Sequence, residues 1–160
     1  MSDIHFSREL IKGKIGEIIF EQMFRRNGNY TILHFGYEYT VPQLAQYHKN
    51  IALQKVIKNI VHAPDFILIS HDNSEVYLVE VKYRKNLVER EVKEIAVKTV
   101  ELWDPSWLFI ATPTGFFFEP CNTVVTNEGK IGPLFDKWAS REVQDEFLGL
   151  LNEFHLKEIG

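Results

Sequence analysis

Two apolar runs separated by a short polar segment constrain this chain more than any other feature of its 160 residues. Residues 66–69 and 76–79 are nearly continuous in aliphatic and aromatic side chains, and the polar segment contains His71-Asp72-Asn73-Ser74. Apolar runs of this length around turn-forming residues predict a β-hairpin. Asp and Asn tolerate the positive φ of a tight turn, so Asp72-Asn73 is placed at its centre. The resulting pairing sets Asp65 directly opposite Glu80.

The predicted pairing concentrates charge on strands that otherwise resemble buried ones. Side chains alternate across a sheet, so Asp65, Glu80 and Lys82 share one face. Two carboxylates opposite one another repel by roughly 0.2–1 kcal/mol in a solvated sheet, and the cost rises in a half-buried one. Such a conflict with the apolar pattern often marks a functional site, and a divalent cation would remove the repulsion. The alternative is a structural ion pair between Lys82 and either acid.

These residues resemble the signature of the PD-(D/E)XK nuclease superfamily, which has the restriction-endonuclease-like fold. The matching segments are Pro64-Asp65, the hairpin, and Glu80-Val81-Lys82. Glu-x-Lys also occurs at Glu91-Val92-Lys93 and Glu128-Gly129-Lys130, but only the first copy ends an apolar strand that follows a Pro-Asp strand. The resemblance implies an α/β fold with an αβββαβ core, in which a mixed central sheet is flanked by helices.

The resemblance also implies a chemistry. Members of the superfamily hold Mg²⁺ through the acidic residues and the carbonyl of the middle residue of Glu-x-Lys, so Asp65, Glu80 and Val81 are the expected metal ligands. Hard divalent cations prefer such oxygen atoms, and Mn²⁺ is expected to substitute. Lys82 would orient the attacking water or neutralise charge on the phosphate. The implied function is metal-dependent hydrolysis of phosphodiester bonds by an endonuclease that acts on DNA.

A first helix is predicted over residues 7–26, where apolar side chains recur at helical spacing. Gly13 and Gly16 each cost about 1 kcal/mol inside a helix relative to Ala, so we expect a close approach to another backbone. Gly13-x-x-Gly16-Glu17 resembles the first helix of many superfamily members, whose acidic residue points at the metal site. Glu17 is therefore a fourth candidate for catalysis and metal binding, and the alternative is an ordinary charge on an exposed helix face.

The whole chain is expected to form one domain, residues 1–160, with a core at about 7–112. The remaining predicted elements are a strand or short hairpin at 30–40, an inserted helix at about 42–61, a helix at about 87–103, a strand at 106–112, a strand or edge at 116–118, and C-terminal helices at about 133–156. The inserted helix and the C-terminal helices depart from the superfamily core. The C-terminal helices are expected to cover a sheet face or to form a homodimer contact.

Basic residues gather beside the predicted site, although the chain has a net charge of −4. Residues 82–98 contain six Lys or Arg against three Asp or Glu, which suits a polyanionic ligand. The candidates for contact with nucleic acid are Arg84, Lys85, Lys93 and Lys98. The overall negative charge favours an alternative function, a catalytically inactive module of the nuclease fold that binds nucleic acid or a protein partner.

Composition and motifs exclude several other classes of protein. Cys121 is the single cysteine, which excludes an internal disulfide and fits a reducing compartment. No apolar run approaches the roughly 18 residues of a membrane span, and the N-terminus does not resemble a signal peptide. The histidines lack the spacing of a zinc site, and there is no glycine-rich nucleotide loop. We therefore expect a cytoplasmic protein that does not contact a membrane.

Overall fold

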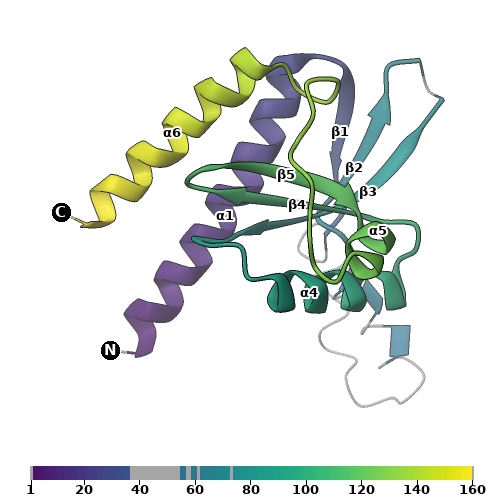
Figure 1. The fold of residues 1–160 in the computed structure, drawn as a ribbon, viewed down its shortest axis with the longest axis horizontal. Coiled ribbons are helices and arrows are strands. Elements are labelled where there is room, and N and C mark those ends of the chain that lie inside the picture. The colour runs from purple at the N-terminus through teal and green to yellow at the C-terminus, as the bar shows by residue number, and fades with distance from the viewer. Residues whose placement is uncertain (1, 37–54, 57–58, 61, 73, 160) are drawn as a thin grey trace.

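The computed structural model describes residues 2–36, 55–56, 59–60, 62–72 and 74–159, with side chains from residue 4 to residue 154. These residues form an α/β protein with a five-stranded mixed sheet and four helices (Figure 1). The helices are α1 (Ser2–Asn27), α4 (Glu89–Leu102), α5 (Cys121–Thr126) and α6 (Arg141–Ile159), and the strands are β1 (Tyr30–His34), β2 (Phe66–Ser70), β3 (Val76–Tyr83), β4 (Trp107–Thr112) and β5 (Gly115–Pro120).

The strands lie in the order β1-β2-β3-β4-β5. β3 and β4 are parallel, and the other neighbouring pairs are antiparallel. A parallel pair needs a crossover connection, and α4 provides it. The predicted α/β class with a mixed sheet flanked by helices is confirmed at this level.

Helices cover both faces of the sheet, and the alternation of side chains along β4 separates the two cores. Phe109 and Ala111 pack in a cluster with side chains of α1 and α6. Leu108 and Ile110 point the other way, into a cluster with side chains of α4 and α5. Because β4 is buried on both sides, its sequence is a continuous apolar run, as expected for an inner strand that is covered on both faces.

The hairpin has the register that the sequence predicts. Phe66 pairs with Val79 and Ile69 with Val76, so continuing the pairing by one residue sets Asp65 opposite Glu80. Asp72 stabilises the turn, because its Oδ1 accepts hydrogen bonds from the hydroxyls of Ser70 and Ser74, each at 2.6 Å. These bonds hold the pKa of Asp72 at about 2, below its ordinary value.

Several element boundaries differ from the prediction. α1 begins at Ser2 rather than at residue 7. A helix start at about residue 133 is wrong, because Pro133 forms a bridge with Phe117 of β5 and the helix begins only at Arg141. The short helix α5 was not predicted, whereas the strand around residues 116–118 is confirmed.

Two predictions in the middle of the chain lie largely outside the described residues. These are the extension of the first strand over 37–40 and most of the inserted helix at about 42–61. Residues 55–56 and 59–60, which are described, are helical. Of the helices in the described ranges, none is long and apolar enough to cross a membrane.

Candidate functional site

The site lies where β2 and β3 separate. The pairing between these strands ends at Phe66 and Val79, but β3 continues to Tyr83 alongside β4. Beyond this point the two strands are joined by a side chain instead of a backbone hydrogen bond. Oδ2 of Asp65 accepts a hydrogen bond from the backbone N–H of Val81, at 2.8 Å. The end of β3 therefore has a notch on its β2 side, and the carboxylate of Asp65 lies in it.

Backbone bonds fix the position of Asp65. Its carbonyl oxygen accepts the N–H groups of Phe35, at 2.9 Å, and Gly36, at 3.2 Å, which directly follow β1. The α-carbon of Asp65 lies only 3.6 Å from the point that a Cβ on Gly36 would occupy, so the two segments are in close contact. Pro64, which precedes Asp65, is buried. The segment after β1 therefore holds the backbone of Asp65, while Val81 of β3 holds its carboxylate.

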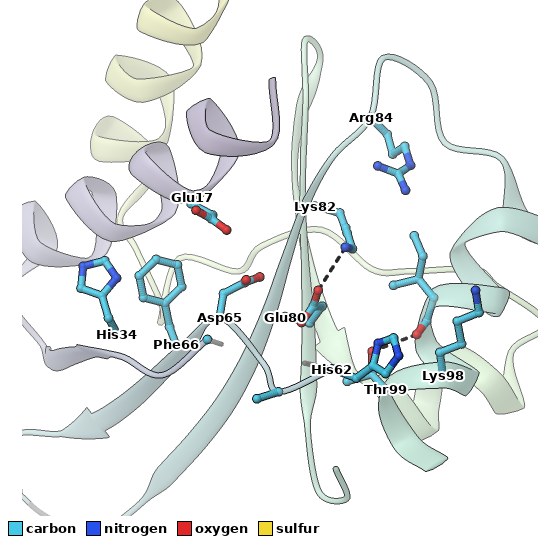
Figure 2. A pocket seen from close by; sticks show the side chains of 13 residues that line it. Glu17, His34, His62, Asp65, Phe66, Glu80, Lys82, Arg84, Lys98 and Thr99 are labelled. Carbon is cyan, nitrogen blue, oxygen red and sulfur yellow. Dashed lines mark hydrogen bonds and ion pairs between the residues drawn. The ribbon is translucent and has the colours of Figure 1, made fainter. Parts of the chain in front are cut away.

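Glu80 and Lys82 lie on the adjacent stretch of β3. They pair with Leu108 and Ile110 of β4, so both side chains start from the sheet face that α4 covers. Lys82 Nζ is 3.1 Å from Glu80 Oε1, and the Glu80 side chain is only 14% exposed. Figure 2 shows the carboxyl group of Asp65 directed toward this pair. The predicted convergence of the two acids and the lysine is thus present.

The carbonyl of Val81 is oriented toward the same notch. Consecutive residues of a strand direct their backbone polar groups to alternate edges, and the N–H and C=O of one residue point to the same edge. Arg84 donates its N–H to Ala111 of β4, and the N–H of Val81 points the other way, to Asp65. The oxygen of Val81 therefore lies on the side of the two strands where Asp65 sits.

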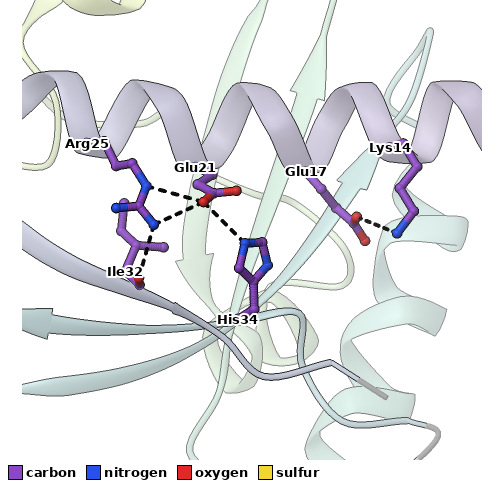
Figure 3. Close-up of polar contacts among 6 residues, drawn as sticks. All are labelled: Lys14, Glu17, Glu21, Arg25, Ile32 and His34. Atoms are coloured by element: carbon purple, nitrogen blue, oxygen red, sulfur yellow. Dashed lines mark hydrogen bonds and ion pairs between the residues drawn. The ribbon is translucent and has the colours of Figure 1, made fainter. Parts of the chain in front are cut away.

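Glu17 reaches the site because α1 packs closely on β3. A Cβ on Gly16 would lie 3.4 Å from Cβ of Tyr83 and 3.5 Å from its nitrogen, so the predicted close approach is confirmed at Gly16. It is wrong at Gly13, where nothing lies within 4 Å of such an atom. Glu17, the next residue, lines the pocket. Its carboxylate forms an ion pair with Lys14 at 3.2 Å (Figure 3).

Burial and like charge make the carboxylates hard to ionise. Loss of hydration raises the pKa of Asp65 from its ordinary value of 3.8 to about 8; Glu80 and Glu17 add to the rise, while the N–H of Val81 and the ammonium of Lys82 oppose it. Burial also raises the pKa of Glu80, against the effect of Lys82. The negative charge of each carboxylate thus opposes ionisation of the other, and a bound cation would relieve this repulsion.

These residues surround a pocket of about 530 Å³. Its lining comes from α1, the end of β1, the segment before β2, the end of β3 and α4: Glu17, His34, Gly36, His62, Ala63, Asp65, Phe66, Glu80, Lys82, Arg84, Ile95, Lys98 and Thr99. The sequence did not indicate His34, His62 or Thr99. His34 ends a predicted strand, but only the pairing of β1 with β2 brings it next to the segment that carries Asp65.

The four predicted nucleic-acid contacts divide into two groups. Arg84 and Lys98 line the pocket, opposite the side formed by α1. Lys85 is exposed and Lys93 forms an ion pair with Glu128 near the end of α5, and neither of them lines the pocket. Basic residues close in sequence are therefore spread over different surfaces, because neighbouring positions after β3 and successive turns of α4 face in different directions.

The donor set suits a hard divalent cation. Two carboxylates and a backbone carbonyl converge on the notch, and Mg²⁺ and Mn²⁺ prefer such oxygen ligands. Among the residues that the structure describes, no three His, Cys, Asp or Glu side chains already converge as a metal site. The carboxylates of Glu17 and Glu80 are engaged with lysines instead. Asp65, Glu80 and the Val81 carbonyl thus fit the cation, and binding would require Glu80 to exchange its lysine partner.

No known family model and no curated protein matches the chain. The structural findings therefore define a class only: an α/β protein with a mixed sheet, whose pocket contains a pair of half-buried carboxylates, a lysine beside them and two further cationic side chains.

Proposed function

We propose that the protein is a Mg²⁺-dependent nuclease that hydrolyses phosphodiester bonds, with DNA as its substrate and an internal position of the strand as its point of attack. One observation carries the proposal: Asp65 and Glu80 face one another across separating strands, and Lys82 lies 3.1 Å from Glu80. Two half-buried carboxylates that face one another destabilise a fold unless a bound cation neutralises their charge. The resemblance of Pro64-Asp65 and Glu80-Val81-Lys82 to the PD-(D/E)XK signature supports the same function.

The proposed ligands are Asp65, Glu80 and the carbonyl of Val81, with Glu17 near enough to raise the pKa of Asp65. When bound, the cation would polarise the phosphate and acidify a water molecule. The hydrogen bond from the Val81 N–H would keep the carboxylate of Asp65 in one orientation during the reaction. Glu80 would exchange its bond with Lys82 for one with the cation.

Lys82 then becomes available to the substrate. Its ammonium is a compact charge with three donors, which can orient the attacking water and neutralise the charge that grows on the phosphoryl oxygens. Its partly exposed side chain, at 36%, leaves it accessible from the pocket. Arg84 and Lys98 would hold the nucleic-acid backbone, since guanidinium and ammonium groups bind phosphate by charge-assisted hydrogen bonds.

The test is cleavage of labelled linear, flapped, junction and single-stranded DNA and of RNA, with Mg²⁺ or Mn²⁺ against EDTA. Asp65→Ala, Glu80→Ala and Lys82→Ala are each expected to abolish cleavage while circular dichroism shows a folded protein. Lys130→Ala is the control, because Lys130 is exposed and does not line the pocket. Activity equal to the wild type in any of the three pocket variants rejects the proposed assignment.

A second candidate function, a binding module without catalytic activity, is favoured by the ion pair between Glu80 and Lys82. A catalytically inactive module could keep Glu80 and Lys82 as a structural pair and bind nucleic acid or a protein through the same pocket. Calorimetric titration with Mn²⁺ distinguishes the two: the nuclease is expected to bind the ion with release of protons, and the module is expected not to bind it. Binding that is lost in Asp65→Asn favours the nuclease.

A further inference from the structure

His34 lies in the pocket on the side away from Arg84 and Lys98. It is the last residue of β1 and pairs with Phe66, the residue that follows Asp65, with 5.1 Å between the two ring centroids. In Figure 2, His34 and Phe66 lie on one side of Asp65 and Glu80, and Arg84 and Lys98 lie on the other. The carboxylates are thus flanked by nitrogen-bearing side chains in two directions.

Two residues of α1 hold the imidazole in place (Figure 3). His34 Nε2 is 3.2 Å from Oε1 of Glu21, whose side chain is only 16% exposed. Arg25 donates two bonds to the same oxygen, at 3.2 and 3.0 Å, and a third to the carbonyl of Ile32 in β1, at 3.4 Å. An ionised carboxylate only accepts, so the ring nitrogen that faces Glu21 carries the proton. Glu21 and Arg25 therefore fix the orientation of the ring relative to the pocket.

The opposite side carries charge that the protein does not itself neutralise. In the described part of the chain, neither Arg84 nor Lys98 forms an ion pair with a carboxylate, and the Arg84 guanidinium donates a hydrogen bond to the carbonyl of Tyr83. Cations that line a pocket without a carboxylate partner favour an anionic ligand. A single phosphate at the carboxylate pair would not reach both these groups and His34, because they lie on opposite sides of it.

We infer that the pocket binds a nucleic-acid strand by three consecutive phosphates: the scissile one beside Asp65 and Glu80, one flanking phosphate at His34, and the other at Arg84 and Lys98. The inference rests on the proposed function and specifies its substrate as a phosphodiester with a phosphate on each side. A strand end, or a small phosphodiester, leaves one of the two flanking contacts empty. A protonated imidazole has a donor on each ring nitrogen, so in that form one nitrogen of His34 would donate to Glu21 and the other to the phosphate.

The test measures cleavage at one central bond of a 5′-labelled dodecanucleotide, single-stranded and annealed to its complement, with Mn²⁺. An uncharged methylphosphonate replaces the phosphate on the 5′ side or on the 3′ side of that bond. Loss of one charge-assisted contact is expected to raise KM for the wild type roughly 10- to 100-fold in each case, with a smaller effect on kcat.

The variants assign each flank to its residue. His34→Ala is expected to be insensitive to the methylphosphonate on one flank and fully sensitive on the other, because the variant has already lost its contact with that phosphate. The double variant Arg84→Ala/Lys98→Ala is expected to show the reverse, and Lys98→Ala alone is expected to lose only part of that sensitivity because Arg84 remains. Glu21→Gln is expected to weaken only the His34 flank. His34→Gln, which keeps a polar side chain, is the second variant if His34→Ala unfolds. His71→Ala, in an exposed turn, and Lys130→Ala are controls that keep both sensitivities.

The outcomes separate this inference from the proposed function. No cleavage of any substrate by the wild type overturns both. Cleavage with His34 variants that respond to both methylphosphonates like the wild type overturns the inference and leaves the nuclease intact. Efficient cleavage of bis(p-nitrophenyl) phosphate, which has no flanking phosphate, together with equal KM values for modified and unmodified strands, also overturns it.

Discussion

Replacing Asp65 by Asn is expected to stabilise the metal-free protein while it abolishes metal binding. The amide is almost the same size as the carboxylate and can still accept the N–H of Val81, but it carries no charge beside Glu80. The wild-type fold keeps the pKa of Asp65 at about 8, far above the 3.8 of an unperturbed side chain. The folded state thus binds more protons than the unfolded state between these values, and its stability falls as pH rises through this window.

The size of the effect follows from the pKa shift. One pKa unit corresponds to about 1.4 kcal/mol. Because the unfolded state ionises Asp65 freely and the folded state does not, the raised pKa costs the wild type on the order of 5 kcal/mol of stability at pH 8. Burying an amide whose N–H groups lack an assured partner costs roughly 1–3 kcal/mol in return. The variant is therefore expected to be more stable by on the order of 2 kcal/mol at pH 8, which corresponds to a Tm about 4–8 °C higher. At pH 4 and below, where the wild-type residue is protonated, the pKa contribution disappears and the variant is expected to be less stable than the wild type by the roughly 1–3 kcal/mol cost of the buried amide.

The assay is thermal and urea unfolding in EDTA at pH 4, 5, 6, 7 and 8, followed by the same series with Mn²⁺. Mn²⁺ is expected to stabilise the wild type and not Asp65→Asn, since binding to the folded state alone raises stability. Asp72→Asn is a control of opposite sign. The pKa of Asp72 is lowered to about 2, so its charge stabilises the fold at neutral pH and this contribution is lost as pH falls toward 2. A difference between Asp65→Asn and wild type that does not grow with pH refutes the reasoning.

Three further predictions concern packing. Gly13→Ala is expected to raise the free energy of unfolding by roughly 0.5–1 kcal/mol, because nothing lies within 4 Å of the added Cβ. Gly16→Val is expected to lower the free energy of unfolding by roughly 1–3 kcal/mol, because the larger side chain forces α1 away from β3. Chemical denaturation of both variants measures the two values, and equal effects would contradict the prediction. Gly129→Ala is expected to destabilise by several kcal/mol, about 3 or more, because φ is +92° and the new Cβ would overlap the carbonyl oxygen of Glu89; a Tm within 1–2 °C of wild type, or about 0.5 kcal/mol, would contradict that contact. Burial raises the pKa of Cys121 to about 11, so the thiol is expected to react with Ellman's reagent at pH 8 only as fast as the protein unfolds; rapid labelling of the native protein would contradict its burial.

The local part of the site could be predicted from the sequence. A short turn between two apolar runs fixes the register of a hairpin, since side chains alternate with a strict period of two. Asp65 and Glu80 therefore had to face each other once Asp72-Asn73 was placed at the turn, and the structure has this register. The β-strand period likewise put Lys82 on the face of Glu80, where the two form an ion pair.

The non-local part could not be predicted. Gly13 and Gly16 carry the same local information, yet only Gly16 lies against β3, because the position of α1 on the sheet decides which glycine is covered. His34 has no motif, and it enters the pocket through the pairing of β1 with β2, two strands that are distant in sequence. Lys93 and Lys98 lie on one helix, but its orientation directs Lys93 to Glu128 and leaves Lys98 at the pocket.

By itself, the sequence determined the hairpin, its charged face and the class of fold, because these depend on periodicity and on turn residues that act within a few positions. Only the tertiary structure decided which side chains surround the carboxylates and how strongly their pKa values rise. Both depend on burial and on contacts between segments whose separation along the chain carries no information about their distance in space.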